Sequence, residues 1–197
     1  MKFILIFLCF SNSHIFAQVS PSSFYKDLCE YKTDGSGKSM GLKMKFSFPC
    51  DWEQANGERP HIVKKFSYAF SEGESIIEAI TVNKMPATPS KKEINALFTK
   101  EGLKELSDGL GTFISGRKLK IDGLDCGEVT FKATRQHPIG KLYLYCLYYY
   151  FIFNDKMIVL SFATGSLEET TTKELFEKYK ILFHGLAGNT IFLSKWE

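Results

Sequence analysis

Residues 141–163 read KLYLYCLYYYFIFNDKMIVLSFA, and this stretch decides the fold. Two runs of aromatic and branched residues, 141–153 and 157–163, flank the short polar break Asn154-Asp155. Aromatic and β-branched side chains favour strands, and a tight polar break between two such runs is typical of a hairpin. Because both runs are almost continuously apolar, the pattern predicts central strands of a sheet that is covered on both faces.

Further strands lie upstream of this hairpin. The sequence alternates between apolar and polar residues in 42–48, which ends at Pro49, and this period of two is typical of a half-buried strand. An Asp122-Gly123 turn separates two more strand-like runs. The strands expected in addition to 141–153 and 157–163 are 42–48, 66–70, 75–83, 113–121 and 124–133. Their short connections predict an antiparallel sheet of about seven strands.

Two segments have helical rather than strand periodicity. Ser90 with Glu93 forms a capping-box pattern, and an apolar stripe follows it as far as Leu106. Ser166 with Glu169 repeats the spacing before a long helix that ends at Gly185 or Gly188, followed by a short strand at 190–193. If the two helices cover opposite faces, the fold is of the α+β class, an α/β/α three-layer sandwich on a mostly antiparallel sheet.

The N-terminal segment predicts export. Lys2 precedes an apolar run, residues 3–10, and the small residue Ala17 follows, a pattern typical of a signal peptide spanning 1–17. The run is too short to span a bilayer. A lipoprotein with Cys9 as the lipidated residue fits less well because bulky Leu8 precedes it, and a buried first strand is the other alternative. We therefore expect a secreted or periplasmic protein without a transmembrane segment after signal removal.

The remaining chain has the size and composition of one globular domain. The full sequence has 197 residues, of which 44% are hydrophobic and 24% charged. Residues 18–40 are mixed and polar and predict an N-terminal arm, and residues 41–197 predict the folded domain. Without residues 1–17, 24 Lys and Arg residues balance 22 Asp and Glu residues, a net charge of +2. This near-balance argues against nucleic-acid binding.

In an oxidising compartment, an even number of cysteines favours disulfides, and Cys29, Cys50, Cys126 and Cys146 remain after signal removal. If the hairpin between 124–133 and 141–153 is centred on Gln136, Cys126 lies directly opposite Cys146, within bridging distance. This register predicts a Cys126–Cys146 disulfide, and elimination leaves Cys29 to pair with Cys50. The alternative is that all four are buried free thiols.

Several short motifs resemble those of the PsbP-like family. They are residues 45–52 (KFSFPCDW), 120–124 (KIDGL), 154–162 (NDKMIVLSF), and FEKY at 176–179 running to NTIF at 189–192. The resemblance covers about residues 41–193 and gives Pro49, Trp52 and Gly123 structural roles. The family includes extrinsic subunits of the oxygen-evolving complex, a small nuclear-transport factor and many exported bacterial proteins. It therefore implies a non-enzymatic binding or assembly protein with a protein partner. The four cysteines and the polar arm depart from the family pattern.

No motif in the sequence indicates catalysis. Gly37-Lys38-Ser39 imitates the end of a phosphate-binding loop, but Lys32 stands where its first glycine is needed. His61, His137 and His184 lack metal-ligand spacing, and no Gly-x-Ser-x-Gly motif occurs. The sequence therefore predicts that the protein is not an enzyme, and it indicates no catalytic residue, metal ligand or cofactor.

The tyrosine-rich run offers one possible binding surface, formed by Tyr143, Tyr145 and Tyr149. Exposed phenol rings bind sugars, bases or apolar partner groups, whereas packing inside the sheet is the interpretation that strand propensity favours. The predicted function is an exported, non-enzymatic binding or assembly accessory protein. The alternative is a small hydrolase or ligand-binding protein with a pocket between the sheet and the C-terminal helix. The partner and the oligomeric state stay open.

Overall fold

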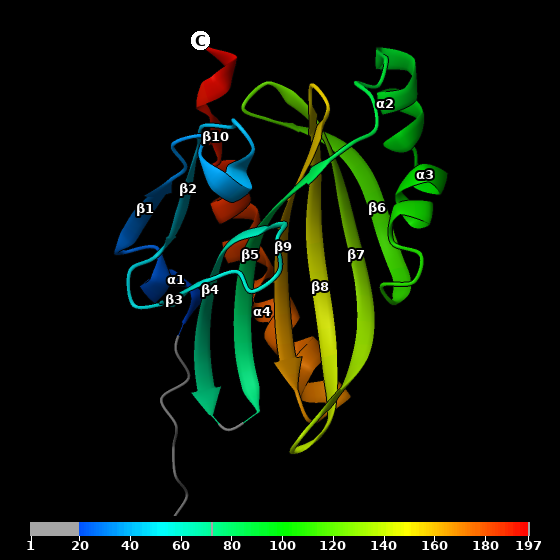
Figure 1. The fold of residues 1–197 in the computed structure, drawn as a ribbon. Coiled ribbons are helices and arrows are strands. Elements are labelled where there is room, and N and C mark those ends of the chain that lie inside the picture. Colours follow the sequence, from blue (N-terminus) through cyan, green and yellow to red (C-terminus); the bar gives the residue numbers. More distant parts are fainter. Residues whose placement is uncertain (1–19, 72, 197) are drawn as a thin grey trace, which may run out of the picture.

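The computed structural model describes residues 20–71 and 73–196, and a seven-stranded antiparallel sheet dominates it (Figure 1). Across the sheet, the strands are β3 (Glu53–Asn56), β4 (Ile62–Ser71), β5 (Glu74–Lys84), β9 (Lys156–Ser166), β8 (Gly140–Phe153), β7 (Leu124–His137) and β6 (Thr112–Ile121). The predicted hairpin of residues 141–163 forms β8 and β9, which lie at the centre of the sheet. The α+β class and the antiparallel sheet are therefore confirmed.

A second, three-stranded sheet packs beside the first (Figure 1). It consists of β1 (Leu28–Lys32), β2 (Met44–Pro49) and the short β10 (Ile191–Phe192), with both neighbours antiparallel to β2. The strand predicted at 42–48 is thus β2 and does not belong to the main sheet. Its place at the edge of the main sheet is taken by β3, which the sequence did not predict because its four residues are exposed and include no large apolar side chain.

The segment predicted as an arm is part of the folded core as far as the structure describes it. It contains α1 (Pro21–Phe24), β1 and the short 3-10 helix η1 (Gly37–Ser39). At the other end of the chain, a second 3-10 helix, η2 (Leu193–Lys195), follows β10. Phe24 is buried against Trp52 and Tyr68. Apolar burial of this kind fixes a segment despite its polar neighbours. The predicted signal peptide, residues 1–17, lies outside the described residues.

Helices cover both faces of the main sheet. The long α4 (Glu169–Gly188) packs on one face, and α2 (Lys91–Leu97) with α3 (Lys100–Leu106) lies on the other (Figure 1). Where one helix was predicted, the chain makes two, because the Thr99 hydroxyl accepts a hydrogen bond from the Gly102 amide and starts a new helix. The Ser90–Glu93 capping box is confirmed, but Ser166 belongs to β9 and does not cap α4.

The two outer layers differ in extent. Side chains alternate between the faces of a strand, and on β9 Ile158, Leu160 and Phe162 are buried in the core cluster beneath α4. Helix α3 packs chiefly against β6 and β7, where Gly127 lets Leu103 approach the strand closely. A Cβ at Gly127 would lie 2.4 Å from Leu103 Cδ2. The sandwich therefore has three layers, but the layer formed by α2 and α3 covers only the β6–β7 end of its face of the sheet.

Candidate functional site

The cysteines form one disulfide instead of two. The predicted Cys29–Cys50 disulfide is present and ties β1 to the residue after β2. The predicted Cys126–Cys146 pairing is wrong, since both are buried free thiols. The β7–β8 hairpin turns over two residues, with His137 opposite Gly140, so Cys126 faces Phe151 across the strands and Cys146 faces Phe131. The two thiols also point to opposite faces, one into each core cluster.

Pro49, Trp52 and Gly123 lie at chain reversals. Pro49 ends β2, and its carbonyl accepts a hydrogen bond from the Trp52 amide. The Trp52 ring is buried edge-on against Phe24, with ring centroids 5.8 Å apart. Gly123 has a φ of 75° in the two-residue turn between β6 and β7, a backbone conformation that favours glycine. The contacts of these three residues are with neighbouring chain segments in the core or at turns.

The three tyrosines of the predicted binding surface do not form one exposed surface. Their odd numbers place all three on the α4 face of β8. Tyr149 is buried, and Tyr145 packs against Phe176 of α4 with ring centroids 5.7 Å apart. Tyr143 is half-buried beneath the Lys141 ammonium group. The packing interpretation therefore describes Tyr145 and Tyr149.

An open groove lies on the opposite face, in the area of the sheet that α2 and α3 leave uncovered. Its volume is about 530 Å³. The floor consists of small residues on β5 and β9, among them Ala79, Ser161 and Ala163. Tyr148 and Tyr150 of β8 form one wall. A groove with a low floor and aromatic or aliphatic walls is suited to apolar groups of a ligand.

Apolar side chains from several elements complete the groove, and basic groups lie near both ends. The remaining apolar lining is Ile62, Ile77, Leu106, Leu110, Leu144, Met157 and Val159. Arg59 and His61 line it beside the start of β4. A neighbouring pocket of about 390 Å³ shares Leu110 and Leu144 with the groove and is lined on the groove face by Arg135, whereas its Lys132, which is ion-paired with Glu169, and its Lys141 lie on the α4 face. The electrostatics of the rim therefore favour acidic groups at the ends of an apolar ligand.

This groove was not predicted from the sequence, because the continuous apolar runs of β8 and β9 are typical of strands that are covered on both faces. A signal was present nonetheless. On β9, the small residues Ser161, Ala163 and Gly165 alternate with large buried ones. Small side chains at every second position leave space above one face of a strand. Ile77, on the same face of β5, remains 39% exposed.

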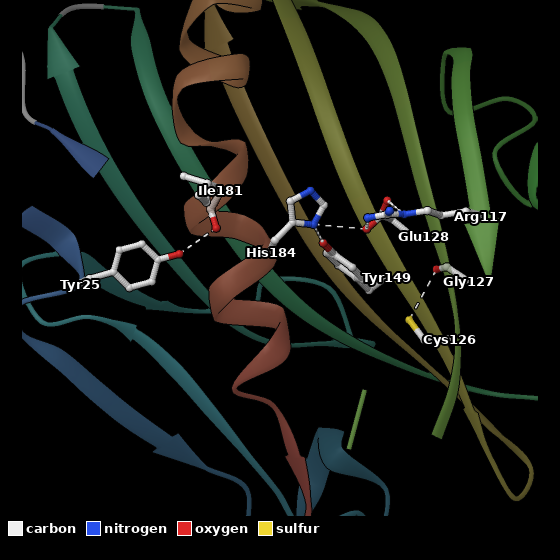
Figure 2. A network of polar contacts seen from close by, with 8 residues as sticks. All are labelled: Tyr25, Arg117, Cys126, Gly127, Glu128, Tyr149, Ile181 and His184. Atoms are coloured by element: carbon white, nitrogen blue, oxygen red, sulfur yellow. Dashed lines mark hydrogen bonds and ion pairs between the residues drawn. The ribbon is translucent and has the colours of Figure 1, made fainter. Parts of the chain in front are cut away.

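A polar cluster lies on the α4 face, at the edge formed by β6 and β7 (Figure 2). Glu128 on β7 accepts two hydrogen bonds from Arg117 of β6, at 2.7 Å from Nε and 3.1 Å from Nη2. His184 Nδ1 lies 3.3 Å from Glu128 Oε2 and 2.5 Å from the Tyr149 hydroxyl oxygen. Cross-strand pairing of Arg117 with Glu128 and the position of His184 on α4 bring the three together.

The electrostatics of this cluster keep Glu128 charged. Burial alone would raise its pKa, but hydrogen bonds from His184 and Arg117, with the charge of Arg117, outweigh burial and lower the pKa to about 2. Burial, followed by the charge of Glu128, raises the pKa of Tyr149. A carboxylate beside an imidazole is also found in hydrolytic triads. Within the part of the chain that the structure describes, however, the hydroxyl bonded to His184 is that of the buried Tyr149, and no serine, threonine or cysteine side chain is hydrogen-bonded to it.

No group of metal-binding side chains occurs among the described residues. Asp122, Asp125 and Glu128, which lie close in sequence, belong to three separate ion pairs with Lys195, Lys118 and Arg117. Across residues 20–71 and 73–196, no helix has the length and apolar character needed to cross a membrane.

The fold and these sites define an α+β protein with a closed helix–sheet interface on one face and an open apolar groove on the other. No family model matches the sequence, and no curated protein matches it. Among solved structures, the chain is similar to cyanobacterial PsbP from Synechocystis sp. PCC 6803, with a TM-score of 0.48 and 14% identity over 84% of this chain and 92% of that chain.

Two further solved structures are similar to the chain. One is LpqN of Mycobacterium tuberculosis, described as involved in cell envelope biogenesis, with a TM-score of 0.43 and 12% identity over 85% of this chain and 93% of that chain. The other is a protein of Bacteroides thetaiotaomicron, with a TM-score of 0.40 and 13% identity over 83% of this chain but 47% of that chain. These likenesses concern the fold.

Proposed function

We propose that this chain is an exported, non-enzymatic binding protein that holds an apolar, acid-flanked segment of a partner protein in the groove. The groove itself carries the proposal. The N-terminal sequence pattern and the Cys29–Cys50 disulfide support export to an oxidising compartment.

The dimensions of the groove fit a peptide segment. From Met157 to Ala163, the groove follows β9 over seven residues, which span about 20 Å at the usual rise of a strand. Its lining includes two tyrosines and a methionine, residue types that are enriched at protein interfaces. An extended segment of about six residues, or a helix of about 13, has this length.

Charge selects among apolar segments. Arg59 and His61 line one end, and Lys65 extends to the same face because it pairs with Ala79 across β4 and β5. Arg135, on the groove face of β7, lines the pocket at the other end. A segment with Asp or Glu on either side of its apolar residues therefore complements the groove, whereas a basic segment is repelled.

Site-specific crosslinking tests this proposal. Benzoylphenylalanine replaces Ile77 at the groove in one variant and Ile181, an exposed isoleucine on α4, in the control. After irradiation in the exported fraction of the source cells, we expect the probe at Ile77 to crosslink one partner, through a peptide with apolar residues between acidic ones. The substitution Ala79→Glu should abolish this crosslink because it places a carboxylate on the groove floor.

Other outcomes would refute the proposal. Equal crosslinking from Ile77 and Ile181, or a crosslink that survives Ala79→Glu, would show that the groove is not the docking site. A small amphiphile found by native mass spectrometry, released by Ala79→Glu and without any peptide crosslink, would make the chain a ligand carrier instead. Hydrolysis of p-nitrophenyl acetate that is lost in His184→Ala would support the hydrolase alternative.

A further inference from the structure

A small hollow of about 350 Å³ opens beside α4, separate from the groove and on the other face of the sheet. Its lining is Ser115, Gly116, Arg117, Glu128, Lys180 and His184. The first three belong to β6, Glu128 to β7 and the last two to α4. The β6–β7 hairpin and α4, which are distant in sequence, therefore bring polar side chains to one place.

The single acid of the hollow is already neutralised. Both oxygens of the Glu128 carboxylate are within hydrogen-bond or ion-pair distance of Arg117, and Oε2 also contacts His184. Its side chain is only 9% exposed. Because its lone pairs face these partners, Glu128 has little capacity left to hold a cation, and its role is to orient Arg117 and His184.

The hydrogen-bond donors that line the hollow, in contrast, retain N–H groups that Glu128 does not use. A guanidinium group carries five N–H bonds, and Glu128 takes two of those of Arg117, whose side chain is 63% exposed. In Figure 2 the second ring nitrogen of His184 points away from Glu128 and Tyr149, and it is an N–H donor when Nδ1 accepts the Tyr149 hydroxyl hydrogen or when the ring is protonated. Lys180 lies one helical turn before His184, on the same side of α4.

We propose that this hollow binds a small oxyanion, a phosphate or carboxylate group, between the Arg117 guanidinium, the Lys180 ammonium and the outward nitrogen of His184. Two permanent positive charges face one buried carboxylate, so the hollow is net positive. Arg and Lys donors around an oxyanion form charge-assisted hydrogen bonds, which are the strong class. Glu177 is one turn before Lys180 on α4 but does not line the hollow.

The test is an NMR titration of residues 18–197 with sodium phosphate, and in a second arm with sodium acetate, at constant ionic strength in sodium chloride and at pH 7. We expect saturable shifts of the Ser115 and Gly116 amides and of the His184 ring, with a dissociation constant of about 1 mM. Shifts with phosphate alone assign the site to phosphate groups, and shifts with acetate alone assign it to carboxylates.

Matched lysine variants separate a site from general surface charge. Lys180→Gln should weaken binding about tenfold, since one charge-assisted hydrogen bond is lost. Lys178→Gln removes the same charge from the same helix, two residues away and outside the hollow, and should leave the affinity within twofold. Absence of saturable shifts in both arms, or equal weakening by the two variants, would overturn the proposal. Both lysines are at the surface, so neither substitution should prevent folding.

Discussion

The two faces of the main sheet are built from alternate residues of the same strands, yet one is closed and the other is half open. On the α4 face, large side chains such as Phe162 and Leu160 interlock with the apolar stripe of α4. On the opposite face, their neighbours Ser161 and Ala163 are small and form the floor of a groove. Whether a face is closed therefore depends on side-chain size at every second position as much as on overall hydrophobicity.

The closed face contains two carboxyl groups in opposite electrostatic situations. Glu128 lies at its edge, paired with Arg117 and His184, and has a lowered pKa. Glu78 lies deep inside it on β5, 1% exposed, and its Oε2 atom has no hydrogen-bond partner among the described residues. Burial raises the pKa of Glu78 to about 8. The carboxyl group of Glu78, which is buried without a hydrogen-bond donor, is thus neutral at pH 7. The carboxyl group of Glu128, which accepts hydrogen bonds from Arg117, is charged.

The largest expected effect is a dependence of folding stability on the protonation of Glu78. Its pKa is raised in the folded state, so its contribution to stability is full below about pH 4.5 and is lost as pH rises through about 8. At 1.36 kcal/mol per unit of pKa, the loss is on the order of 5 kcal/mol. Urea unfolding at pH 5 and pH 8.5 measures it. Glu78→Gln should remove most of this change in the free energy of unfolding. An equal change in the wild-type protein and the variant would show that water solvates the Glu78 carboxylate in the folded state.

Adjacent isoleucines on β5 compare the two faces directly. Ile76 points into the α4 core and is fully buried, whereas Ile77 faces the groove and is 39% exposed. Ile76→Ala should lower the free energy of unfolding by about 2–5 kcal/mol, because it leaves a cavity. Ile77→Ala should lower it by less than about 1 kcal/mol. Similar losses from denaturant unfolding would mean that the groove face is as closed as the other.

Much of this fold could be predicted from sequence because local signals and the final structure agree. The hairpin at 154–155, the Asp122-Gly123 turn and the Ser90 capping box depend on a few neighbouring residues, and all three are present. The sheet to which each strand belongs depends on distant pairing. The alternation of 42–48 is equally compatible with either sheet, and Ala55 is the only apolar residue of β3, so no apolar pattern predicts that strand.

The candidate site was predictable only in part, for the same reason. The Cys126–Cys146 prediction failed because the hairpin was centred on Gln136 instead of on the two-residue turn at 138–139, a register error that also moves side chains between faces. The cluster of Arg117, Glu128 and His184 depends on the docking of α4 on β8 and β9, which no sequence spacing encodes. Its only local signal is the cross-strand position of Arg117 and Glu128 about the Asp122-Gly123 turn.

The third prediction concerns the disulfide that ties β1 of the small sheet to the residue after β2. Replacing Cys29 and Cys50 by serine should lower the free energy of unfolding by about 3 kcal/mol, given a loop of 21 residues. A thiol titration provides the control. In unfolded, non-reduced protein of residues 18–197, two thiols should react, and peptide mapping should place them at Cys126 and Cys146. Four reactive thiols, or mapping to Cys29, would contradict the pairing.

The smallest expected effect again comes from neighbouring residues on opposite faces. The Tyr149 hydroxyl is hydrogen-bonded to His184 in the polar cluster, whereas the Tyr150 hydroxyl, on the groove wall, has no such partner among the described residues. Tyr149→Phe should therefore lower the free energy of unfolding by about 1 kcal/mol, and Tyr150→Phe by less than about 0.5 kcal/mol. Denaturant midpoints at equal m-values measure both. If Tyr150→Phe were the more costly, a polar partner would have to reach the groove wall, and the apolar segment proposed for the groove would no longer fit it.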